Sequence, residues 1–448
     1  MPERSVSLRE AARFWGQLGW VSFGGPAGQI ALLHETLVER RRWLSERRFL
    51  HALNYCMLLP GPEAIQLATY LGWLMHGTAG ALVAGGLFLL PSIGILLALS
   101  TIYALWGQLP LLASVFWALK PAVLAIVVQA AWKVGRRTLA TPFLATIAAM
   151  AFLALGWWKV PYPLVVAGAA MAGGLVGQLR PRWMDPKSTG RRPVAPEAAA
   201  VAANAPEVAT PCLHDDDTPT PAHARPSRAR LALTLLLSGL ALGLPLVALS
   251  LSQGWNGPLP TMARFFTRVA LLSFGGAYAV LPYVAQGAVD TFGWLRADQM
   301  IDGRALGETT PGPLIMVVAF VGFMGGWTLS GNLAFAAVAL LVVVWFTFLP
   351  SFAFILAGGP LVEASRENLS LSAPLRAITA AVTGVIGSLA LFFLGPVLWP
   401  AAGGGSLDSL ALALFLVSLV LLLRQNWGVI PLIGAAALTG LVRQLVLG

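Results

Sequence analysis

The chain has 448 residues, of which 57% are hydrophobic and only 11% are charged, whereas soluble globular proteins carry about 25% charged residues. Apolar runs of about 20 residues, long enough to span ~30 Å of hydrocarbon, recur from end to end and exclude a soluble enzyme. The net charge of +10 does not indicate nucleic-acid binding, because the basic residues lie in short loops between apolar runs, as membrane orientation requires. We therefore predict an all-α polytopic membrane protein.

The cysteines and histidines predict no disulfide, metal site or cofactor. Cys56 lies in an apolar stretch and Cys212 in a polar one, so no disulfide framework is supported. The five histidines show no metal-ligand spacing. The amino terminus, MPERSVSLREAARFW, lacks a cleavage-site pattern after a short apolar core, so we expect it to remain in the mature protein.

Apolar runs predict six helices before a long polar stretch. They lie at about residues 14–33, 62–76, 80–105, 110–132, 139–156 and 160–178. The polar stretch, residues 180–230, is rich in Pro, Ala, Asp and Arg. It cannot bury enough apolar surface to fold and is predicted to be a disordered linker without packed contacts.

One extra transmembrane helix is predicted after the linker, at residues 231–251, and six further apolar runs follow it. Those six lie at about residues 265–285, 313–330, 333–357, 375–394, 405–423 and 427–446. The second series has the same number of runs as the first, which suggests a duplicated unit.

An internal repeat supports the duplication. RFWGQLGWVSFGG, beginning at Arg13, returns as RFFTRVALLSFGG beginning at Arg264, an offset of 264 minus 13, or 251. The same offset relates Pro60-Gly61-Pro62 to Pro311-Gly312-Pro313, and Leu90-Pro91-Ser92 returns as Leu349-Pro350-Ser351. The predicted organisation is a first repeat at 1–179, a cytoplasmic linker at 180–230, a connecting helix at 231–252 and a second repeat at 253–448.

The number of spans and the charges predict that the two repeats have inverted topology. Six spans, one extra span and six more spans place the second unit upside down relative to the first. Residues 34–48 contain five arginines, whereas the equivalent residues 285–299 contain only Arg296 against Asp290 and Asp298. By the positive-inside rule the first stretch is cytoplasmic and the second is external.

Glycine and proline breaks predict re-entrant hairpins in each repeat. If residues 14–33 crossed the membrane fully from an inside amino terminus, the arginine cluster would lie outside. Breaks at Phe23-Gly24-Gly25-Pro26 and at Pro60-Gly61-Pro62 remove this conflict if each is the tip of a hairpin of two half-length helices. The amino terminus and the linker are then cytoplasmic, and the carboxyl terminus is external.

The second break in each repeat predicts an anion site. Pro suits the first position of a helix, so we expect Pro62 and Pro313 each to open a helix. The first-turn N–H groups and the helix dipole then favour an anion; the amides concerned are those of Glu63, Ala64, Ile65, Leu314, Ile315 and Met316. Gly24-Gly25-Pro26 and Gly275-Gly276-Ala277 offer the same arrangement. The alternative is a kink whose polar groups are satisfied by neighbouring helices.

The ordered motifs FGGP, RRRWL, LPGPEAIQLA and LKPAVLAIVVQA resemble those of the chromate ion transporters in their long, two-domain form. The resemblance implies a bacterial inner-membrane carrier that expels chromate, a sulfate-like dianion, driven by the membrane potential or a proton gradient. The second repeat departs from the pattern, since Thr310 stands at the position equivalent to Leu59 of LPGP and the second repeat has no triple arginine. A tetrahedral dianion suits the predicted site, because its oxygens accept several N–H bonds.

The candidate substrate-binding residues are Ser22, Gly24, Gly25, Arg40, Arg41, Arg42, Pro60, Gly61, Pro62, Glu63, Gln66, Lys120, Ser273, Gly275, Gly276, Pro311, Gly312, Pro313 and Arg376. Charges in apolar spans such as Lys120 and Arg376 mark a pathway, unless they snorkel from a helix end. The three successive arginines either gather anions or only fix the topology.

Two carboxylates are candidates for proton coupling. Glu63 lies where an anion is expected, so protonating it would admit the anion and give symport; antiport would need proton and anion to exclude each other, and both schemes stay open. The alternative is that Glu63 only complements the helix dipole. Glu308 is predicted to pair with Arg304 at i, i+4 spacing and is the second candidate.

Other functions are weighed against efflux. No GxxxxGK[ST] loop is present, so ATP is not the energy source within this chain. A carrier that takes up sulfate or a related oxyanion would use the same site. A membrane enzyme or lipid-handling protein is opposed by the absence of any cluster with catalytic spacing. The expected partners are a chromate or sulfate-like oxyanion, the lipid bilayer and, as an option, a second copy in a homodimer.

Overall fold

The computed structural model describes residues 6–23, 25–180, 183, 212–213, 218, 221–274, 277–364, 373–400, 406–425 and 427–447. These residues are overwhelmingly helical, and no β-strand occurs among them. Seven of the described helices are long and apolar enough to cross a membrane. The prediction of an all-α polytopic membrane protein is confirmed.

The first repeat begins with four short helical segments, and longer helices follow them. They are α1 (Leu8–Val21), α2 (Gly25–His34), η1 (Glu35–Arg40), α3 (Glu46–Leu58), α4 (Glu63–Trp106), α5 (Pro110–Thr138), α6 (Pro142–Gly156) and α7 (Tyr162–Leu179). η1 is a single π-helical turn that continues α2. The predicted helix at 14–33 is therefore two half-length helices, separated at the Ser-Phe-Gly-Gly motif.

The second repeat follows the same order after the short turn η3 (Ala222–Ala224) and the connecting helix α9 (Arg228–Gln253). Its elements are α10 (Pro258–Leu272), α11 (Ala277–Ala285), η4 (Gln286–Thr291), α12 (Ala297–Thr309), η5 (Leu314–Met316), α13 (Val317–Ser330), α14 (Leu333–Ala364), α15 (Ala373–Leu398), α16 (Ser409–Arg424) and α17 (Val429–Leu447). α9 buries none of its residues, so its apolar surface is left for lipid.

Aromatic contacts show that the chain folds back on itself at the first break in each repeat, as the predicted hairpins require. The Arg41 guanidinium lies 4.8 Å from the Phe14 ring centre, and the Trp43 ring packs edge-on against Phe14 at 5.0 Å. The end of the hairpin thus lies beside its beginning. In the second repeat, Phe266 of α10 stacks on Trp294, which follows η4, at 6.0 Å.

The second hairpin of the first repeat consists of α3 and the first part of α4. α4 is interrupted at His76 and at Gly77, where φ is +62°, so its first 13 residues form a half-length segment, as the separate predictions for 62–76 and 80–105 imply. The His76 ring contacts the Val6 carbonyl at 2.8 Å. This hairpin therefore returns to the side on which α1 begins.

The two repeats interlock through a pair of equivalent hydrogen bonds. The Gly61 amide donates to the Ser273 carbonyl at 2.8 Å, and the Gly312 amide donates to the Ser22 carbonyl at 2.7 Å. Each bond joins the second break of one repeat to the first break of the other, and all four residues are related by the offset of 251. This reciprocal pairing, which we call the crossing, lies on a pseudo-two-fold axis.

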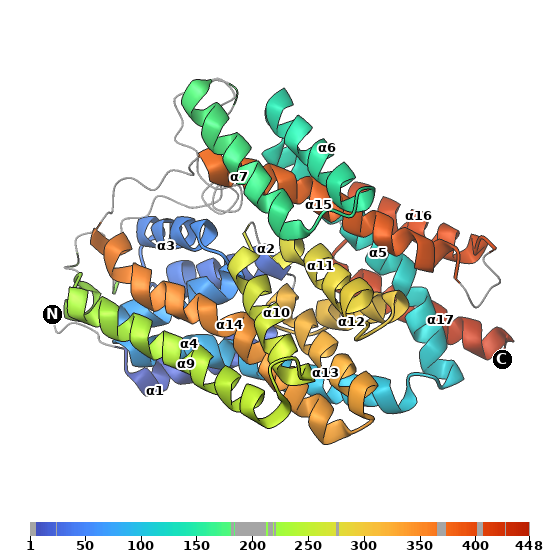
Figure 1. The fold of residues 1–448 in the computed structure, drawn as a ribbon, viewed down its shortest axis with the longest axis horizontal. Coiled ribbons are helices and arrows are strands. Elements are labelled where there is room, and N and C mark those ends of the chain that lie inside the picture. The colour runs from blue at the N-terminus through green and yellow to red at the C-terminus, as the bar shows by residue number, and fades with distance from the viewer. Residues whose placement is uncertain are drawn as a thin grey trace.

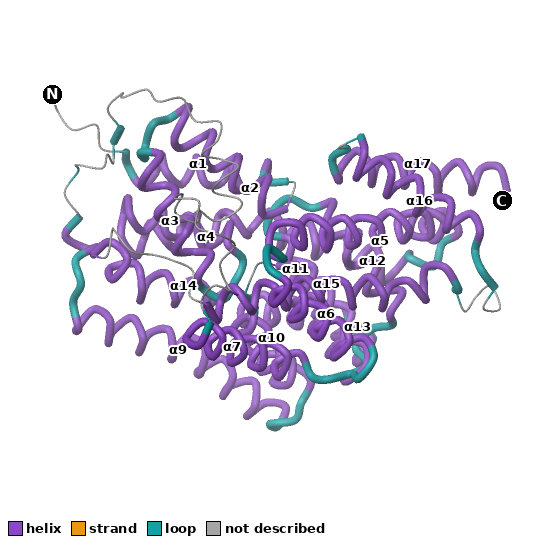
Figure 2. The backbone as a smooth tube through the Cα atoms, turned by 90° about the horizontal axis from the view of Figure 1, so that it is seen from above, coloured by secondary structure: helices purple, strands orange, loops and turns teal. Residues whose placement is uncertain are grey.

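The hairpins of the two repeats enter from opposite sides. Glu363, at the end of α14, accepts a hydrogen bond from Tyr70 in the first repeat's hairpin at 2.5 Å, whereas Tyr103, near the end of α4, donates to Asp302 in the second repeat's hairpin at 2.8 Å. Figures 1 and 2 agree that α1 and α3 lie at one end of the molecule and α16 and α17 at the other. Each hairpin thus lies beside the end of the other repeat's long helix, as inverted repeats require, and the sides of the membrane that the two repeats face stay a prediction.

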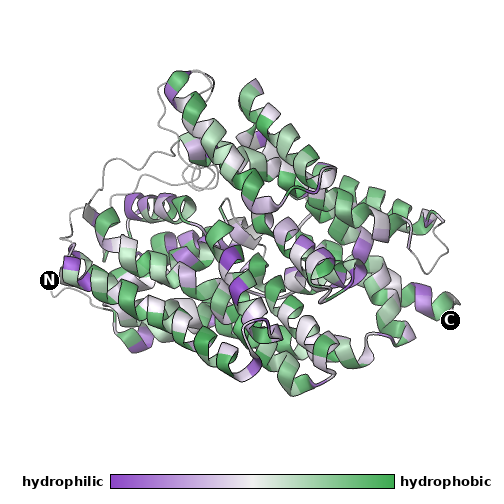
Figure 3. Cartoon of the chain, viewed as in Figure 1, coloured by the Kyte–Doolittle hydropathy of each residue, from purple (hydrophilic) through white to green (hydrophobic). Residues whose placement is uncertain are grey.

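Hydropathy is distributed as a membrane requires. Figure 3 shows hydrophobic residues covering the outward helices, including α6, α7 and α9, whereas hydrophilic residues gather in the middle of the molecule and at helix ends. The hydrophilic centre coincides with the broken helices, since irregular backbone in a membrane is tolerated only where protein or a cavity surrounds it.

The described part of the linker is packed, which corrects the prediction for residues 180–230. The Leu213 amide donates to the Arg42 carbonyl at 3.0 Å, and Arg48 donates to the Thr218 carbonyl at 2.6 Å. The His223 ring bonds the Trp73 carbonyl at 2.9 Å. That carbonyl lies in the last turn before α4 is interrupted at His76 and Gly77, so the linker caps the helix at its break. Residues 181–182, 184–211, 214–217 and 219–220 lie outside the described residues.

Candidate functional site

The crossing requires glycine at two equivalent positions. Gly61 has φ of +133° and Gly312 has φ of +102°, values that side chains rarely tolerate. A Cβ atom on Gly61 would lie 2.4 Å from Gln66 Nε2, and one on Gly312 would lie 1.9 Å from Ser92 Oγ. The two glycines thus bring backbone amides and polar side chains into close contact at the centre of the protein.

Helix starts flank both glycines, but they are not identical. Pro62 and Pro313 each stand immediately before the first helical residue rather than within the first turn. In the first repeat the amides of Glu63, Ala64 and Ile65 have no acceptor within the helix.

The second repeat differs in one amide. Its helix opens with the 3-10 turn η5, in which the Met316 amide donates to the Pro313 carbonyl at 2.8 Å. The prediction that Met316 offers a free donor is therefore wrong, because the tighter turn satisfies its amide. The amides of Leu314 and Ile315 remain without an acceptor inside the helix.

Buried hydroxyls surround the crossing without acceptors. Ser22 and Ser273 are fully buried, and neither hydroxyl has a hydrogen-bond partner within the described parts of the chain. Burying an unsatisfied polar group costs roughly 1–3 kcal/mol. The two equivalent hydroxyls are therefore available as hydrogen-bond donors at the crossing.

Two glutamines add further donors and acceptors. Gln66 Nε2 donates to the Pro60 carbonyl at 2.8 Å, and Gln29 Nε2 donates to the carbonyls of Ser22 and Gly312. The Oε1 atoms of both glutamines have no partner among the residues described. Gln29 was not predicted, and only its position one turn after Pro26 could have suggested it.

The repeated Leu-Pro-Ser sequences also contribute to the crossing. The Ser92 hydroxyl donates to the Pro311 carbonyl, and the Ser351 hydroxyl would lie 2.5 Å from a Cβ on Gly61. Each serine therefore approaches the Pro-Gly-Pro of the opposite repeat. The recurrence of Leu-Pro-Ser was the sequence signal for them.

Arg304 is the cation most deeply buried beside the second repeat's first break. It pairs with Glu308 at 3.1 Å, as predicted, and its side chain is 1% exposed. Its guanidinium carbon lies 5.1 Å from the ring centre of Tyr278 on α11. Nε and Nη1 have no hydrogen-bond partner within the described residues, which leaves two charged donors for an anion.

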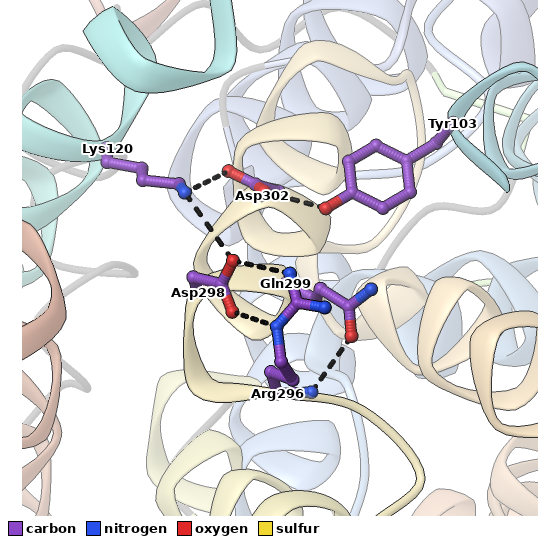
Figure 4. Close-up of polar contacts among 6 residues, drawn as sticks. All are labelled: Tyr103, Lys120, Arg296, Asp298, Gln299 and Asp302. Carbon is purple, nitrogen blue, oxygen red and sulfur yellow. Dashed lines mark hydrogen bonds and ion pairs between the residues drawn. The ribbon is translucent and has the colours of Figure 1, made fainter. Parts of the chain in front are cut away.

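A second charged cluster joins α5 to α12, as Figure 4 shows. Lys120 Nζ lies 3.6 Å from Asp302 Oδ1 and 4.0 Å from Asp298 Oδ2. Arg296 binds Asp298 through two nitrogens, at 3.0 and 2.9 Å, and the Tyr103 hydroxyl donates to Asp302 Oδ2 at 2.8 Å. Lys120 is thus held in ion pairs instead of snorkelling to a membrane surface. Asp302 and Tyr103 were missed, because their pairing depends on contacts between repeats.

The remaining candidates lie away from the crossing or outside the described residues. Arg376 is the fourth residue of α15, which begins at Ala373, in agreement with the helix-end alternative. Arg40 pairs with Glu35 at 2.6 Å and Arg41 with Glu10 at 4.0 Å, on the first hairpin's exposed end, and Arg42 is also exposed, which favours a topological role for the three arginines. Gly25 begins α2 with φ of +69°. Gly24, Gly275 and Gly276 are not among the described residues.

The arrangement has the chemistry that an anion requires. Amides, hydroxyls and the Arg304 guanidinium provide donors in a buried region, and four oxygens of a tetrahedral anion accept several of them at once. No group of three or more metal-ligating side chains occurs in the described part of the chain.

Comparison with known proteins gives one consistent result. The profile of the family described as "Chromate transporter" matches residues 9–174 and 260–441. The chromate transport protein of Pseudomonas aeruginosa is 32% identical over 84% of this chain and 78% of its own length. The chromate transport protein of Cupriavidus metallidurans is 28% identical over 98% and 94%, and the probable chromate transport protein of Synechococcus elongatus is 28% identical over 85% and 83%. No solved structure matches the chain.

Proposed function

The chain belongs to the chromate transporter family, and from that premise we propose that it is a secondary carrier that expels chromate across the bacterial inner membrane and confers chromate resistance. Its family makes it a multi-pass membrane transporter and not an enzyme. Direction, energy source and the residues of the site belong to the proposal.

The crossing is the proposed chromate site. The observation that carries this assignment is the reciprocal pair of Gly–Ser hydrogen bonds, beside which the hydroxyls of Ser22 and Ser273 are buried without acceptors within the described residues. A dianion placed there receives hydroxyl and amide hydrogen bonds from both repeats, and the open donors of Arg304 supply positive charge. Rocking of one repeat against the other would then expose the site to alternate sides.

The different charges on the equivalent helices α3 and α12 support export. At the offset of 251, Arg47 on α3 corresponds to Asp298 on α12, and His51 corresponds to Asp302. By the positive-inside rule the α3 side faces the cytoplasm, where the exposed Arg47 attracts anions. On the other side the equivalent positions carry Asp298 and Asp302 instead of positive charge.

Vesicle transport tests the direction and the substrate. Labelled chromate is supplied to energised inside-out vesicles that contain the protein, and uptake above that of protein-free vesicles is expected. Energised uptake only in right-side-out vesicles would identify an importer. Preference for labelled sulfate over chromate in either orientation would favour the sulfate carrier.

Serine substitutions test the location of the site. Ser22→Ala and Ser273→Ala each remove a hydrogen bond to a charged ligand, worth about 1.5–3 kcal/mol, so chromate should bind about 10 to 100 times more weakly. Ser250→Ala is the matched control, because its hydroxyl bonds its own helix in α9 at 2.7 Å. Unchanged affinity in both site variants, measured by equilibrium binding to the purified protein, would move the site elsewhere.

A further inference from the structure

The cluster around Lys120 joins the two repeats apart from the crossing. Lys120 lies ten residues into α5 (120 minus 110), a rise of about 15 Å, so its charge lies deep in the membrane. Asp302 is on α12, two residues before Arg304, and the same half-helix therefore connects this cluster to the proposed chromate site. An ionisable group at such depth is costly and is retained for a function.

Asp302 has one satisfied oxygen and one open oxygen. Oδ2 accepts the Tyr103 hydroxyl at 2.8 Å. Oδ1 lies 3.6 Å from Lys120 Nζ, beyond hydrogen-bond length, and has no hydrogen-bond partner in the described regions. The Asp302 side chain is 4% exposed, whereas that of Lys120 is 20% exposed. Lys120 is therefore the more exposed partner of a buried carboxylate.

We propose that Asp302 is the proton-binding carboxylate of the transport cycle, and that it exchanges with the anion for Lys120. This rests on the proposed function. When Asp302 is ionised, its carboxylate pairs with the Lys120 ammonium and neutralises it. When Oδ1 takes a proton, Lys120 becomes available to bind chromate at a second position, beside α12. Loss of that proton displaces the anion.

Every charged group that faces Asp302 fits this balance. α5 contributes Lys120, α4 contributes Tyr103, and Asp298 with Arg296 forms its own bidentate pair. On α17, Arg443 stacks over Trp117 at 4.0 Å. α13 carries no charged residue, and the only charged residue of α15 is Arg376, in the first turn of that helix. The two acids and two bases of the cluster cancel, so protonating Asp302 leaves one net positive charge for the anion to neutralise.

The exchange makes proton and anion binding mutually favourable, which selects symport from the two schemes that the sequence left open. Chromate would leave with one proton and a net charge of one negative unit. An inside-negative membrane potential drives that movement, whereas an acidic exterior opposes it. Collapsing the pH gradient in energised inside-out vesicles should therefore increase chromate uptake.

The direct test is proton uptake when chromate binds to the purified full-length protein, over a pH range in which chromate stays a dianion. The wild type should take up as much as one proton per anion, and its affinity should approach a loss of about tenfold per unit rise in pH, the slope of a single linked proton. Asp302→Asn should take up no proton, and its affinity should stay flat with pH. Asp298→Asn is the matched control and should keep proton uptake, because Asp298 is held by Arg296.

Two other variants keep the test decisive if Asp302→Asn fails to fold. Tyr103→Phe removes the donor that stabilises the ionised carboxylate, so the loss of affinity should begin at higher pH. Asp302→Glu should retain proton uptake. Undiminished proton uptake in Asp302→Asn, or an unmoved pH dependence in Tyr103→Phe, would overturn the coupling role. A wild type that binds no chromate at all would overturn the proposed function instead.

Discussion

Gly61 and Gly312 hold the backbone in a conformation that no other residue adopts cheaply, and their positions follow from the repeated Pro-Gly-Pro. Replacing either with Val forces a β-branched side chain to positive φ, a strain of about 1–3 kcal/mol, and fills the space beside Gln66 or Ser92. Chromate transport in vesicles should fall by about tenfold or more for each variant.

The control for these variants is Gly239→Val on α9, where an added Cβ meets no described atom within 4 Å. Its transport and membrane level should match the wild type. Equal transport by Gly61→Val and Gly239→Val would mean that the crossing is not used by the anion.

Glu63 is buried at the first position of α4, where both of its predicted roles remain open. Glu63→Gln keeps the backbone donors and removes the titratable charge. If Glu63 couples protons, the pH dependence of transport should flatten while anion binding persists. If Glu63 only complements the helix dipole, the pH dependence of transport should stay unchanged, and thermal unfolding should show a loss of about 0.3–1 kcal/mol in stability. Glu308 would then be the remaining predicted candidate, and its ion pair with Arg304 would have to open before it could take a proton.

At the scale of elements, the breaks were predictable and the contacts between breaks were not. Gly and Pro act on their own neighbours, so Ser-Phe-Gly-Gly and Pro-Gly-Pro showed where helices end. The 3-10 start at Leu314 was not predicted, because the first repeat has the same Pro-Gly-Pro and continues directly as an α-helix. Asp302 was missed because its partners, Lys120 and Tyr103, come from helices far away in the sequence.

The linker now carries a narrower prediction. Deleting residues 193–211 should leave transport and stability intact, because no contact of the described linker depends on them. His223→Ala should leave the Trp73 carbonyl without its donor and lower the stability of the protein by about 0.5–1.5 kcal/mol. Thermal unfolding in detergent measures the difference, and an equal melting temperature for His223→Ala and the wild type would contradict the capping role.

For the whole molecule, the structure places the start of α1 and the end of α17 at opposite ends (Figure 1). With the arginine-rich hairpin in the cytoplasm, the linker is inside and the carboxyl terminus is outside. Reporter fusions at Gly190 and Gly448 should therefore give opposite signals. If both report the same side, the assignment of sides or the number of crossings is wrong.

The inverted architecture, whose membrane sides stay a prediction, could be proposed from the sequence because it depends on counting spans and arginines. The interlocking of the repeats could not, since hydropathy does not reveal which glycine amide meets which serine carbonyl. The offset of 251 relates equivalent residues, whereas the observed bonds join residues that are not equivalent to each other.

The crossing also constrains how the protein is made. The Ser22 carbonyl bonds an amide that lies 290 residues later in the chain (312 minus 22), and the Gly61 amide bonds a carbonyl that lies 212 residues later (273 minus 61). In a newly synthesised first repeat the Ser22 carbonyl can already accept from Gln29 Nε2, but the Gly61 amide lacks its acceptor, and an unpaired backbone group costs several kcal/mol in lipid. The crossing can form only after the second repeat has been synthesised, so membrane insertion of the first repeat and final folding are separate events in the biogenesis of this protein.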